Sequence, residues 1–342
     1  MSLYNIVDQI FIGQCVGELG NAATNVAFPF TTLCIATALA FGIGGASGFN
    51  LNLGAGEKEK TPYFIGVSAS MMFIIGVVLS VVGLTALKPL LLFFGSTDTV
   101  LPYAMEYTKY LALGFPFAII SSGGSHLVRA DGSPKFSMAC NLVGAIVNVI
   151  LDYLFVMVFN WKMAGAAIAT VIGQILASIM VIWYLIHFKT IKLHGKHFVP
   201  QLKIVGRTVH LGMAQCLNQL AIMFVQVVMN KSLTYYGALS PYGADIPLAC
   251  TGIVMKVNQV YFSICIGVAQ GIQPIASFNR GAGKNDRVKK TYKLAVSCNT
   301  IISTIAFIIF QLFPRQIISI FGSGGPEYFR FSINFFRIFL FM

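Results

Sequence analysis

A short segment near residue 52 of this chain recurs near residue 279, and this recurrence constrains the fold more than any single motif. Residues 52–56 read Asn-Leu-Gly-Ala-Gly and residues 279–283 read Asn-Arg-Gly-Ala-Gly, an offset of 227 positions (279 minus 52). The same offset pairs further residues without a gap: Ala22 with Ala249, Thr24 with Thr251, Gly44 with Gly271, and Phe94-Gly95-Ser96 with Phe321-Gly322-Ser323. Self-similarity at one fixed offset over this length indicates a duplicated architecture.

The two copies of the repeat are not equally complete. Met342 falls opposite Phe115, so the second copy stops well before the end of the first. The second copy begins near residue 208, and the offset then places the start of the first copy ahead of Met1. We therefore expect a fragment that lacks the start of its first helix and the last part of its second copy.

The composition excludes a soluble globular domain. Apolar residues make up 56% of the chain, charged residues make up 10%, and the mean hydropathy is +0.78. Soluble domains carry about 25% charged residues. Apolar runs bounded by polar turns predict about ten helices, each near the roughly 20 residues that cross a bilayer. They cover residues 1–16, 25–48, 63–86, 104–124, 138–158, 164–187, 208–236, 247–275, 292–312 and 329–342.

The basic residues between these segments alternate in number from one loop to the next. The loops near 49–62, 125–137, 188–207 and 279–293 carry fifteen: Lys58, Lys60, Arg129, Lys135, Lys189, Lys192, Lys196, Lys203, Arg207, Arg280, Lys284, Arg287, Lys289, Lys290 and Lys293. The other loops carry only Lys88, Lys162 and Arg315. This asymmetry places the first set of loops in the cytoplasm. The net charge of +12 is therefore an orientation signal and predicts no nucleic-acid partner.

The two Gly-Ala-Gly segments fall on the same predicted side of the membrane, so the two copies run in the same direction. Repeats of that kind are related by an axis along the membrane normal. The sequence thus predicts an all-α polytopic membrane protein of two six-helix lobes, with about ten of twelve spans present. We expect an N-terminal lobe at 1–187, a cytoplasmic linker at 188–207 and a C-terminal lobe at 208–342.

Enzymatic and cofactor chemistry finds little support in the sequence. No cysteines are paired as CxxC, there is no Walker motif, and the glycines of residues 42–48 lie inside a predicted span rather than after a strand. His187, His194 and His197 cluster in the linker. They indicate either a metal site or, the favoured interpretation, a solvated basic linker. We expect no enzyme and no bound cofactor.

A few ionisable groups lie at membrane depth. Asp8 is about eight residues, roughly 12 Å, from the outer end of the first segment. Asp152 lies in the outer half of the fifth, with Asn148 four residues earlier on the same helix face. A carboxylate there costs at least ~2.5–3.5 kcal/mol unless it faces a cavity, a partner or a cation. Thr170 and Gln174 add oxygen atoms from the sixth segment; the alternative is an acid that only bonds a neighbouring helix.

Several stretches resemble the multidrug and toxic-compound extrusion (MATE) family of transporters. The likeness follows the chain from end to end and is closest to the MepA-like bacterial branch. It is carried by Leu3–Gly13, Arg129–Pro134, Asn148-x-x-x-Asp152, Gly165–Thr170, Gln270–Ile275, Phe278–Ala282 and Arg287-Val288.

The resemblance implies a bacterial multi-pass plasma-membrane antiporter that exports cationic or apolar drugs in exchange for H+ or Na+. It implies a cation site in the first lobe made by Asp8, Asn148, Asp152 and Thr170, with Na+ as the one metal ion to consider. No coenzyme and no obligate protein partner are implied. The coupling ion would reach these acids from outside, and a cationic substrate would then leave as the carrier alternates between its two faces.

The chain departs from the family pattern in two places. Tyr153 follows Asp152 where many members have proline, which predicts a different local bend. No carboxylate lies within the seventh or eighth segment, so coupling would rest on the first lobe. The substrate cleft would then be lined by Gln174 and by polar residues of the second lobe: Asn218, Gln219, Lys256, Asn258 and Gln259. Lys256 fits a snorkelling or ion-paired lysine equally well.

Two other hypotheses stay open on the sequence. A lipid-linked oligosaccharide flippase shares the two-lobed plan, but it needs a strongly cationic cavity, and only Lys256 lies at depth here. The chain could also be an inactive truncated fragment.

Overall fold

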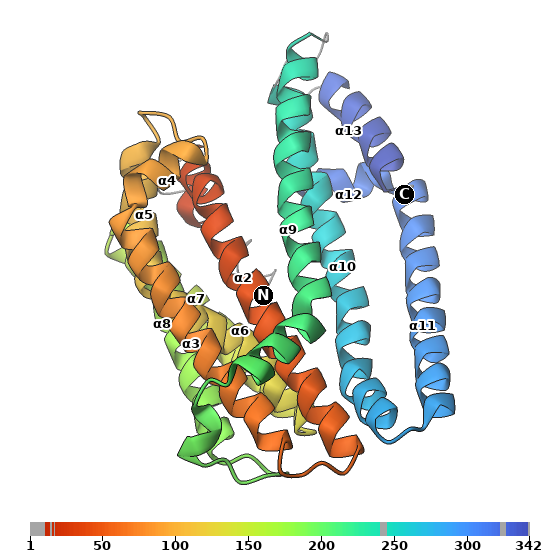
Figure 1. Cartoon of the computed structure of the whole chain (residues 1–342). Coiled ribbons are helices and arrows are strands. Elements are labelled where there is room, and N and C mark those ends of the chain that lie inside the picture. The colour runs from red at the N-terminus through yellow and green to blue at the C-terminus, as the bar shows by residue number, and fades with distance from the viewer. Residues whose placement is uncertain (1–10, 14–15, 17, 240–244, 322–325, 341–342) are drawn as a thin grey trace. The chain divides into compact units, whose positions relative to one another are not determined.

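The described residues of the computed structural model are 11–13, 16, 18–239, 245–321 and 326–340, and within them the chain is helical, without strands (Figure 1). The α-helices are α2 (Glu18–Gly54), α3 (Thr61–Thr85), α4 (Leu87–Phe93), α5 (Leu101–Leu113), α6 (Phe115–Ala130), α7 (Pro134–Asp152), α8 (Lys162–Ile186), α9 (Leu202–Ala238), α10 (Asp245–Gly281), α11 (Asn285–Leu312), α12 (Pro314–Phe321) and α13 (Pro326–Phe339). A π-helix, η1 (Tyr153–Val158), follows α7, and a 3₁₀ turn, η2 (Gly195–Phe198), lies between α8 and α9.

The described helices confirm a polytopic membrane protein. Seven are long and apolar enough to cross a bilayer, and α5 with α6 forms an eighth if the bent pair is one span. Ten spans were predicted. The predicted span at 1–16 falls largely outside the described residues. The one at 329–342 corresponds to α13, whose 14 residues are shorter than the roughly 20 that span the hydrocarbon core.

The predicted span at 104–124 is broken, and its sequence explains the break. α5 and α6 meet at Gly114 with a bend of 57°. Pro116 has no N–H to donate to the Ala112 carbonyl one turn earlier, and its ring crowds that carbonyl. The Ser80 hydroxyl of α3 donates a hydrogen bond to the Ala112 carbonyl instead. A side chain from a neighbouring helix thus satisfies the backbone group that the proline leaves unpaired.

Two predicted loops are wrong in their extent because the helices continue past the membrane-length window. Residues 18–24, predicted as loop, are the first turns of α2, which runs for 37 residues or about 55 Å. Residues 285–293, predicted as a basic loop, form the start of α11. Lysine and arginine are good helix formers, so a run of charge marks the end of a span but not the end of a helix.

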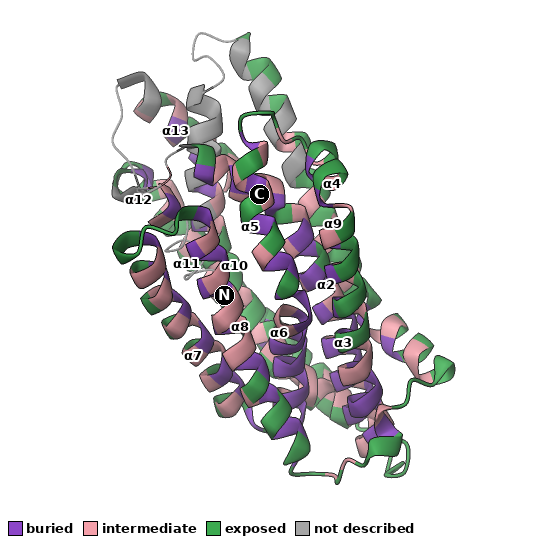
Figure 2. Ribbon diagram, turned by 90° about the vertical axis from the view of Figure 1, so that its left-hand side faces the viewer, coloured by how far each residue is buried: buried purple, intermediate pink, exposed green. Residues whose placement is uncertain are grey.

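The chain divides into two compact units. The first comprises residues 3–221 together with 277–284, and the second comprises 222–276 together with 285–342. The predicted lobes follow the repeat in the sequence rather than compactness, and they remain a prediction. In the first unit, buried faces of α2, α3, α5, α6 and α8 form one continuous apolar core, and purple bands mark these faces in Figure 2.

Backbones approach one another closely where glycines lie between the helices of this core. A Cβ atom on Gly42 of α2 would lie 2.5 Å from the carbonyl oxygen of Gly123 on α6. A Cβ atom on Gly123 would in turn meet the Ala38 carbonyl at 2.9 Å. Helices in membranes associate largely by such close packing of small residues.

The two Gly-Ala-Gly segments have the same backbone conformation, which supports the duplication. Gly56 has a φ angle of 80° and Gly283 one of 70°. The N–H group that follows each glycine donates to the carbonyl of Asn52 or Asn279, at 2.9 Å in both cases. This is the Schellman ending, in which a left-handed residue, usually glycine, closes a helix. Both copies therefore end a long helix by one device at equivalent positions.

The two helix ends also touch each other within the first unit. A Cβ atom on Gly54 would lie 2.1 Å from the carbonyl oxygen of Phe278, and one on Gly281 would lie 2.0 Å from that of Leu51. Gly54 and Gly281 are partners under the 227-residue offset, and so are Leu51 and Phe278. The contact is therefore symmetric with respect to the repeat.

The linker after α8 is anchored to the first unit at two places. The buried Asp131 carboxylate accepts hydrogen bonds from the Tyr184 hydroxyl (2.9 Å) and from the backbone N–H groups of Lys189 (2.8 Å) and Thr190 (3.0 Å). At the second place the Ser70 hydroxyl of α3 donates to the Phe198 carbonyl at 2.6 Å.

His197 belongs to this second anchor, so the interpretation of the histidine cluster as solvated is wrong for it. Only 6% of its surface is exposed, and its ring packs edge-on against Tyr63 with centroids 4.8 Å apart. Its Nδ1 accepts the N–H of His194 at 3.0 Å and so caps η2. An imidazole that must accept a hydrogen bond at Nδ1 fits this place only when neutral.

The α2–α6 contact predicts the cost of adding a side chain there. Gly42→Val should lower the free energy of unfolding by about 1–3 kcal/mol, because the neighbouring atoms belong to the backbone and cannot move aside. A thermal unfolding scan in detergent should show the loss. Gly206→Val is the matched control, since a Cβ there meets nothing within 4 Å. Equal losses in both variants would contradict the packing argument.

The linker should undock as the pH falls. Burial, and then the charges of Lys196 and His194, lower the pKa of His197 below its ordinary value of 6.5. The unfolded linker therefore binds a proton more readily, so docking is complete above pH 6.5 and is lost as the pH falls below it.

Hydrogen exchange of residues 194–199 tests this, after correction for intrinsic rates. Exchange should rise when the pH goes from about one unit above 6.5 to about one unit below. His197→Gln, which keeps an acceptor and does not titrate, should abolish the difference. An equal rise in both proteins would count against the histidine as its source.

Candidate functional site

The candidate site is built on the contact between α7 and α8. Gly144 and Gly173 face each other there: a Cβ on Gly144 would lie 2.9 Å from the Gly173 carbonyl oxygen, and one on Gly173 would lie 2.7 Å from that of Gly144. With the backbones this close, Asn148 of α7 reaches Thr170 of α8, and its Nδ2 donates to the threonine Oγ1 at 3.3 Å. The structure thus brings together two of the predicted site residues.

Asp152 completes the row on α7. Gly144, Asn148 and Asp152 are spaced by four, so they share one face of the helix. Asp152 is fully buried and Asn148 is 2% exposed. The predicted coupling acid is thus buried within the protein, and its role in a cation site remains a prediction. Asp8, the other predicted acid, lies outside the described residues.

The helix changes register immediately after Asp152. Residues 153–158 form the π-helix η1, at the place where Tyr153 predicted a different local bend. The N–H of Phe159 bonds to the carbonyl of Leu154, five residues earlier, at 2.8 Å. Single π-helical turns within α-helices are found frequently at functional sites. Tyr153 therefore changes the kind of irregularity at this point and does not remove it.

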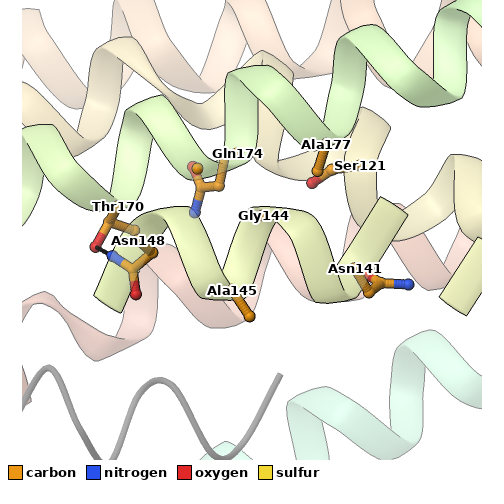
Figure 3. Close-up of a pocket in the computed structure, with 9 residues that line it drawn as sticks. Ser121, Asn141, Gly144, Ala145, Asn148, Thr170, Gln174 and Ala177 are labelled. Carbon is orange, nitrogen blue, oxygen red and sulfur yellow. Dashed lines mark hydrogen bonds between the residues drawn. The ribbon is translucent and has the colours of Figure 1, made fainter. Parts of the chain in front are cut away.

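A pocket lies beside Asn148 (Figure 3). It is lined by Ser121 of α6, by Asn141, Gly144, Ala145 and Asn148 of α7, and by Thr170, Gly173, Gln174 and Ala177 of α8. Two buried oxygen atoms at this place, Asn148 Oδ1 and Gln174 Oε1, have no hydrogen-bond partner among the described residues. Leaving a buried acceptor unpaired costs about 1–3 kcal/mol, which a bound cation or water would recover.

Two of the polar lining residues, Asn141 and Ser121, were not predicted. Asn141 lies seven residues before Asn148 and therefore on the same face of α7. That spacing is visible in the sequence, but Asn141 is close to the predicted end of its span, where polar residues are ordinary. Ser121 gave no such signal, because serine is common inside membrane helices.

The residues predicted for the substrate cleft do not lie together in one site. Gln174 lies at the pocket with Asn148. Asn218 is exposed and Gln219 half-buried on the part of α9 that belongs to the first unit. Asn258 is half-buried and Gln259 exposed on α10, in the second unit. The side chain of Lys256 lies outside the described part, and none of these four other residues lines the pocket.

A transition-metal site is not supported by the part of the chain that the structure describes. Within it, no group of three or more His, Cys, Asp or Glu side chains could hold a metal ion. In the linker, His194 and His197 rings are 5.5 Å apart, whereas the His187 Nδ1 lies 2.9 Å from the Trp183 carbonyl oxygen on α8. The oxygen-rich α7–α8 contact would suit a hard cation better than the imidazoles would.

The chain matches the MatE family model over residues 1–154 and 214–342. The protein belongs to the MatE family. It is 25% identical over 324 residues to the Multidrug export protein MepA of Staphylococcus saprophyticus, which covers 94% of this chain and 70% of the relative. It is 23% identical over 331 residues to the Probable multidrug resistance protein YoeA of Bacillus subtilis, covering 94% and 69%.

Solved structures of MATE proteins share the fold. A crystal structure of MATE in the straight conformation superposes with a TM-score of 0.89 at 22% identity, covering 99% of this chain and 75% of that one. A structure in the bent conformation gives 0.84 at 21% identity, covering 99% and 74%. The family, the export proteins among its relatives and the apolar helices identify this MatE protein as a multi-pass membrane transporter and not an enzyme.

Proposed function

We propose that this MatE protein exports cationic and apolar drugs in exchange for H+ or Na+ by alternating access, across a bacterial plasma membrane with its basic loops in the cytoplasm. The observation that carries the proposal is the fully buried Asp152 one helical turn from the Asn148–Thr170 pair. The named relatives support the direction and the substrate class, since MepA is a multidrug export protein and YoeA a probable multidrug resistance protein.

The buried oxygen atoms suit a coupling ion that binds in one state and leaves in the other. A carboxylate at membrane depth costs at least ~2.5–3.5 kcal/mol, and a bound proton or sodium ion removes that cost. Asn148 and Thr170 supply neutral oxygen atoms of the kind that hard cations prefer. Asp8 would provide the second carboxylate from the first helix.

The energy available from one such ion is sufficient for export. A unit charge crossing 100 mV supplies ~2.3 kcal/mol, and each pH unit adds ~1.4 kcal/mol. For a neutral drug the two terms add to ~3.7 kcal/mol and support a gradient of a few hundredfold, whereas for a monovalent cation the exchanged charges cancel and one pH unit supports about tenfold. One H+ for each drug molecule would therefore produce useful efflux.

The glycine contact between the two repeat ends supplies a candidate closing element. Gly54 and Gly281 hold the ends of α2 and α10 together within the first unit. The segments next to them carry basic residues, so the positive-inside rule puts this contact on the cytoplasmic side. In an alternating-access cycle such a contact would form in one state and separate in the other.

The acids should be required for coupled efflux. Asp152→Asn and Asp8→Asn should each abolish most ethidium efflux from energised cells, because neither amide can bind a proton or hold the charge of Na+. Asp98→Asn, in an exposed loop, is the control acid and should have no effect. Comparing collapse of the pH gradient with collapse of the sodium gradient would identify the coupling ion. Full efflux by both site variants would overturn the proposal.

The repeat contact should control the change of state. Gly54→Val should slow ethidium efflux at least tenfold, because its side chain collides with the backbone at Phe278. Equilibrium binding of ethidium, measured by fluorescence polarisation, should persist. The control is Gly206→Val, where the added atoms meet open space. Unchanged efflux by Gly54→Val would show that the ends need not close against each other.

A further inference from the structure

We infer that the pocket between α6, α7 and α8 is a passage by which the coupling ion leaves Asn148, with Gln174 and Asn141 as its next contacts. The occupant is a small monovalent cation carried by oxygen atoms and water. The inference rests on the proposed function and extends it: it assigns Gln174 to the ion path rather than to the substrate cleft.

The position of the pocket gives the path a direction. Asp152 lies after Asn148 on α7, whereas the pocket residues Asn141 and Gly144 lie before it. On the antiparallel α8, Gln174 follows Thr170. The pocket therefore extends from Asn148 toward the start of α7 and the end of α8, over about 10 Å at 1.5 Å per residue. Asn148 stands between the buried carboxylate and this pocket.

The pocket is lined by side chains of two kinds. Its members are either polar (Ser121, Asn141, Asn148, Thr170, Gln174) or small (Gly144, Ala145, Gly173, Ala177). A drug site would be lined mainly by large apolar and aromatic side chains. Water is stable in a polar cavity that offers two to four partners, and an alkali cation needs the same oxygen atoms.

Unpaired groups distinguish a passage from polar contacts that merely hold helices together. A structural amide in a membrane protein is expected to be paired, because lipid offers it no partner. Asn148 Oδ1 and Gln174 Oε1 are buried without a hydrogen-bond partner among the described residues. Asn148 is only 2% exposed, and its side chain is at the pocket in Figure 3.

Beyond Asn141 the polar groups of Ser125 and Ser137 are paired with one another and with the backbone, and they extend the polar lining toward the start of α7. The Asn141 Nδ2 donates to the Ser125 Oγ at 3.1 Å and to the Ser137 carbonyl at 2.9 Å. The Ser137 hydroxyl donates to the Ser125 carbonyl at 2.9 Å, and the Ser125 hydroxyl to the Ser121 carbonyl at 2.8 Å. These groups approach the loop between α6 and α7, which the positive-inside rule places in the cytoplasm.

Gln174→Met tests the passage, because methionine has the length of glutamine without its polar atoms. The purified full chain, reconstituted in liposomes, is assayed for ethidium transport driven by a proton gradient and, separately, by a sodium gradient. We expect the variant to lose at least tenfold in the ion-driven rate, while its Kd for ethidium and its thermal unfolding temperature stay unchanged. Gln174→Asn should recover part of the rate. Ser178→Ala, on the same helix outside the lining, should behave as wild type.

The outcomes separate the inference from the function on which it rests. If neither gradient drives the wild-type protein, the proposed function fails and the passage fails with it. If wild type is driven and Gln174→Met is equally fast, only the passage is overturned. A higher Kd for ethidium in Gln174→Met would instead assign Gln174 to the substrate site. The gradient whose effect is lost in Gln174→Met identifies the ion that uses the passage.

Discussion

The close approach of α7 to α8 is the contact on which the candidate site depends. At Gly144 and Gly173 the backbone of each helix lies against the carbonyl oxygen of the other. At this separation the side chain of Asn148 reaches Thr170, and Asp152 lies one turn further along the same face. A larger residue at either glycine would push the helices apart and fill the polar pocket. Packing and function are thus supported by the same two residues.

Glycine has a second use in this chain, at the ends of the long helices. Gly56 and Gly283 end their helices in the left-handed conformation, and Gly54 and Gly281 allow those ends to touch. The repeated sequence is therefore most similar where the backbone geometry is most demanding. The acids follow the opposite pattern where they can be compared, because the residue opposite Asp8 is Tyr235. The two copies are thus alike at their helix endings and differ at this acid.

The positions of the membrane-spanning helices could be predicted from the sequence, whereas features that depend on contacts with a neighbouring helix could not. Helices α3, α7 and α8 were predicted almost to their ends, since lipid leaves the backbone few alternatives. The break at Gly114 depends on Pro116 and also on Ser80 of α3. Ser80 is too far away in the sequence for any local pattern to reveal its contact with Ala112. In the site, Asn148 and Asp152 were visible as polar groups in an apolar run. The pocket residue Ser121 was not, because only the packing of α6 against α7 and α8 gives it a role.

The turn after Asp152 interrupts the helix without a proline. A proline there would break the helical hydrogen-bond ladder by lacking an N–H group. Tyr153 retains its N–H, which bonds to the carbonyls of Val149 and Ile150. The ladder is opened instead by the π-helix of residues 153–158. Both devices leave the backbone irregular directly after the buried acid. The coupling proposed for Asp152 requires the acid to change its surroundings, and the π-helix beside it supplies a segment whose register can change.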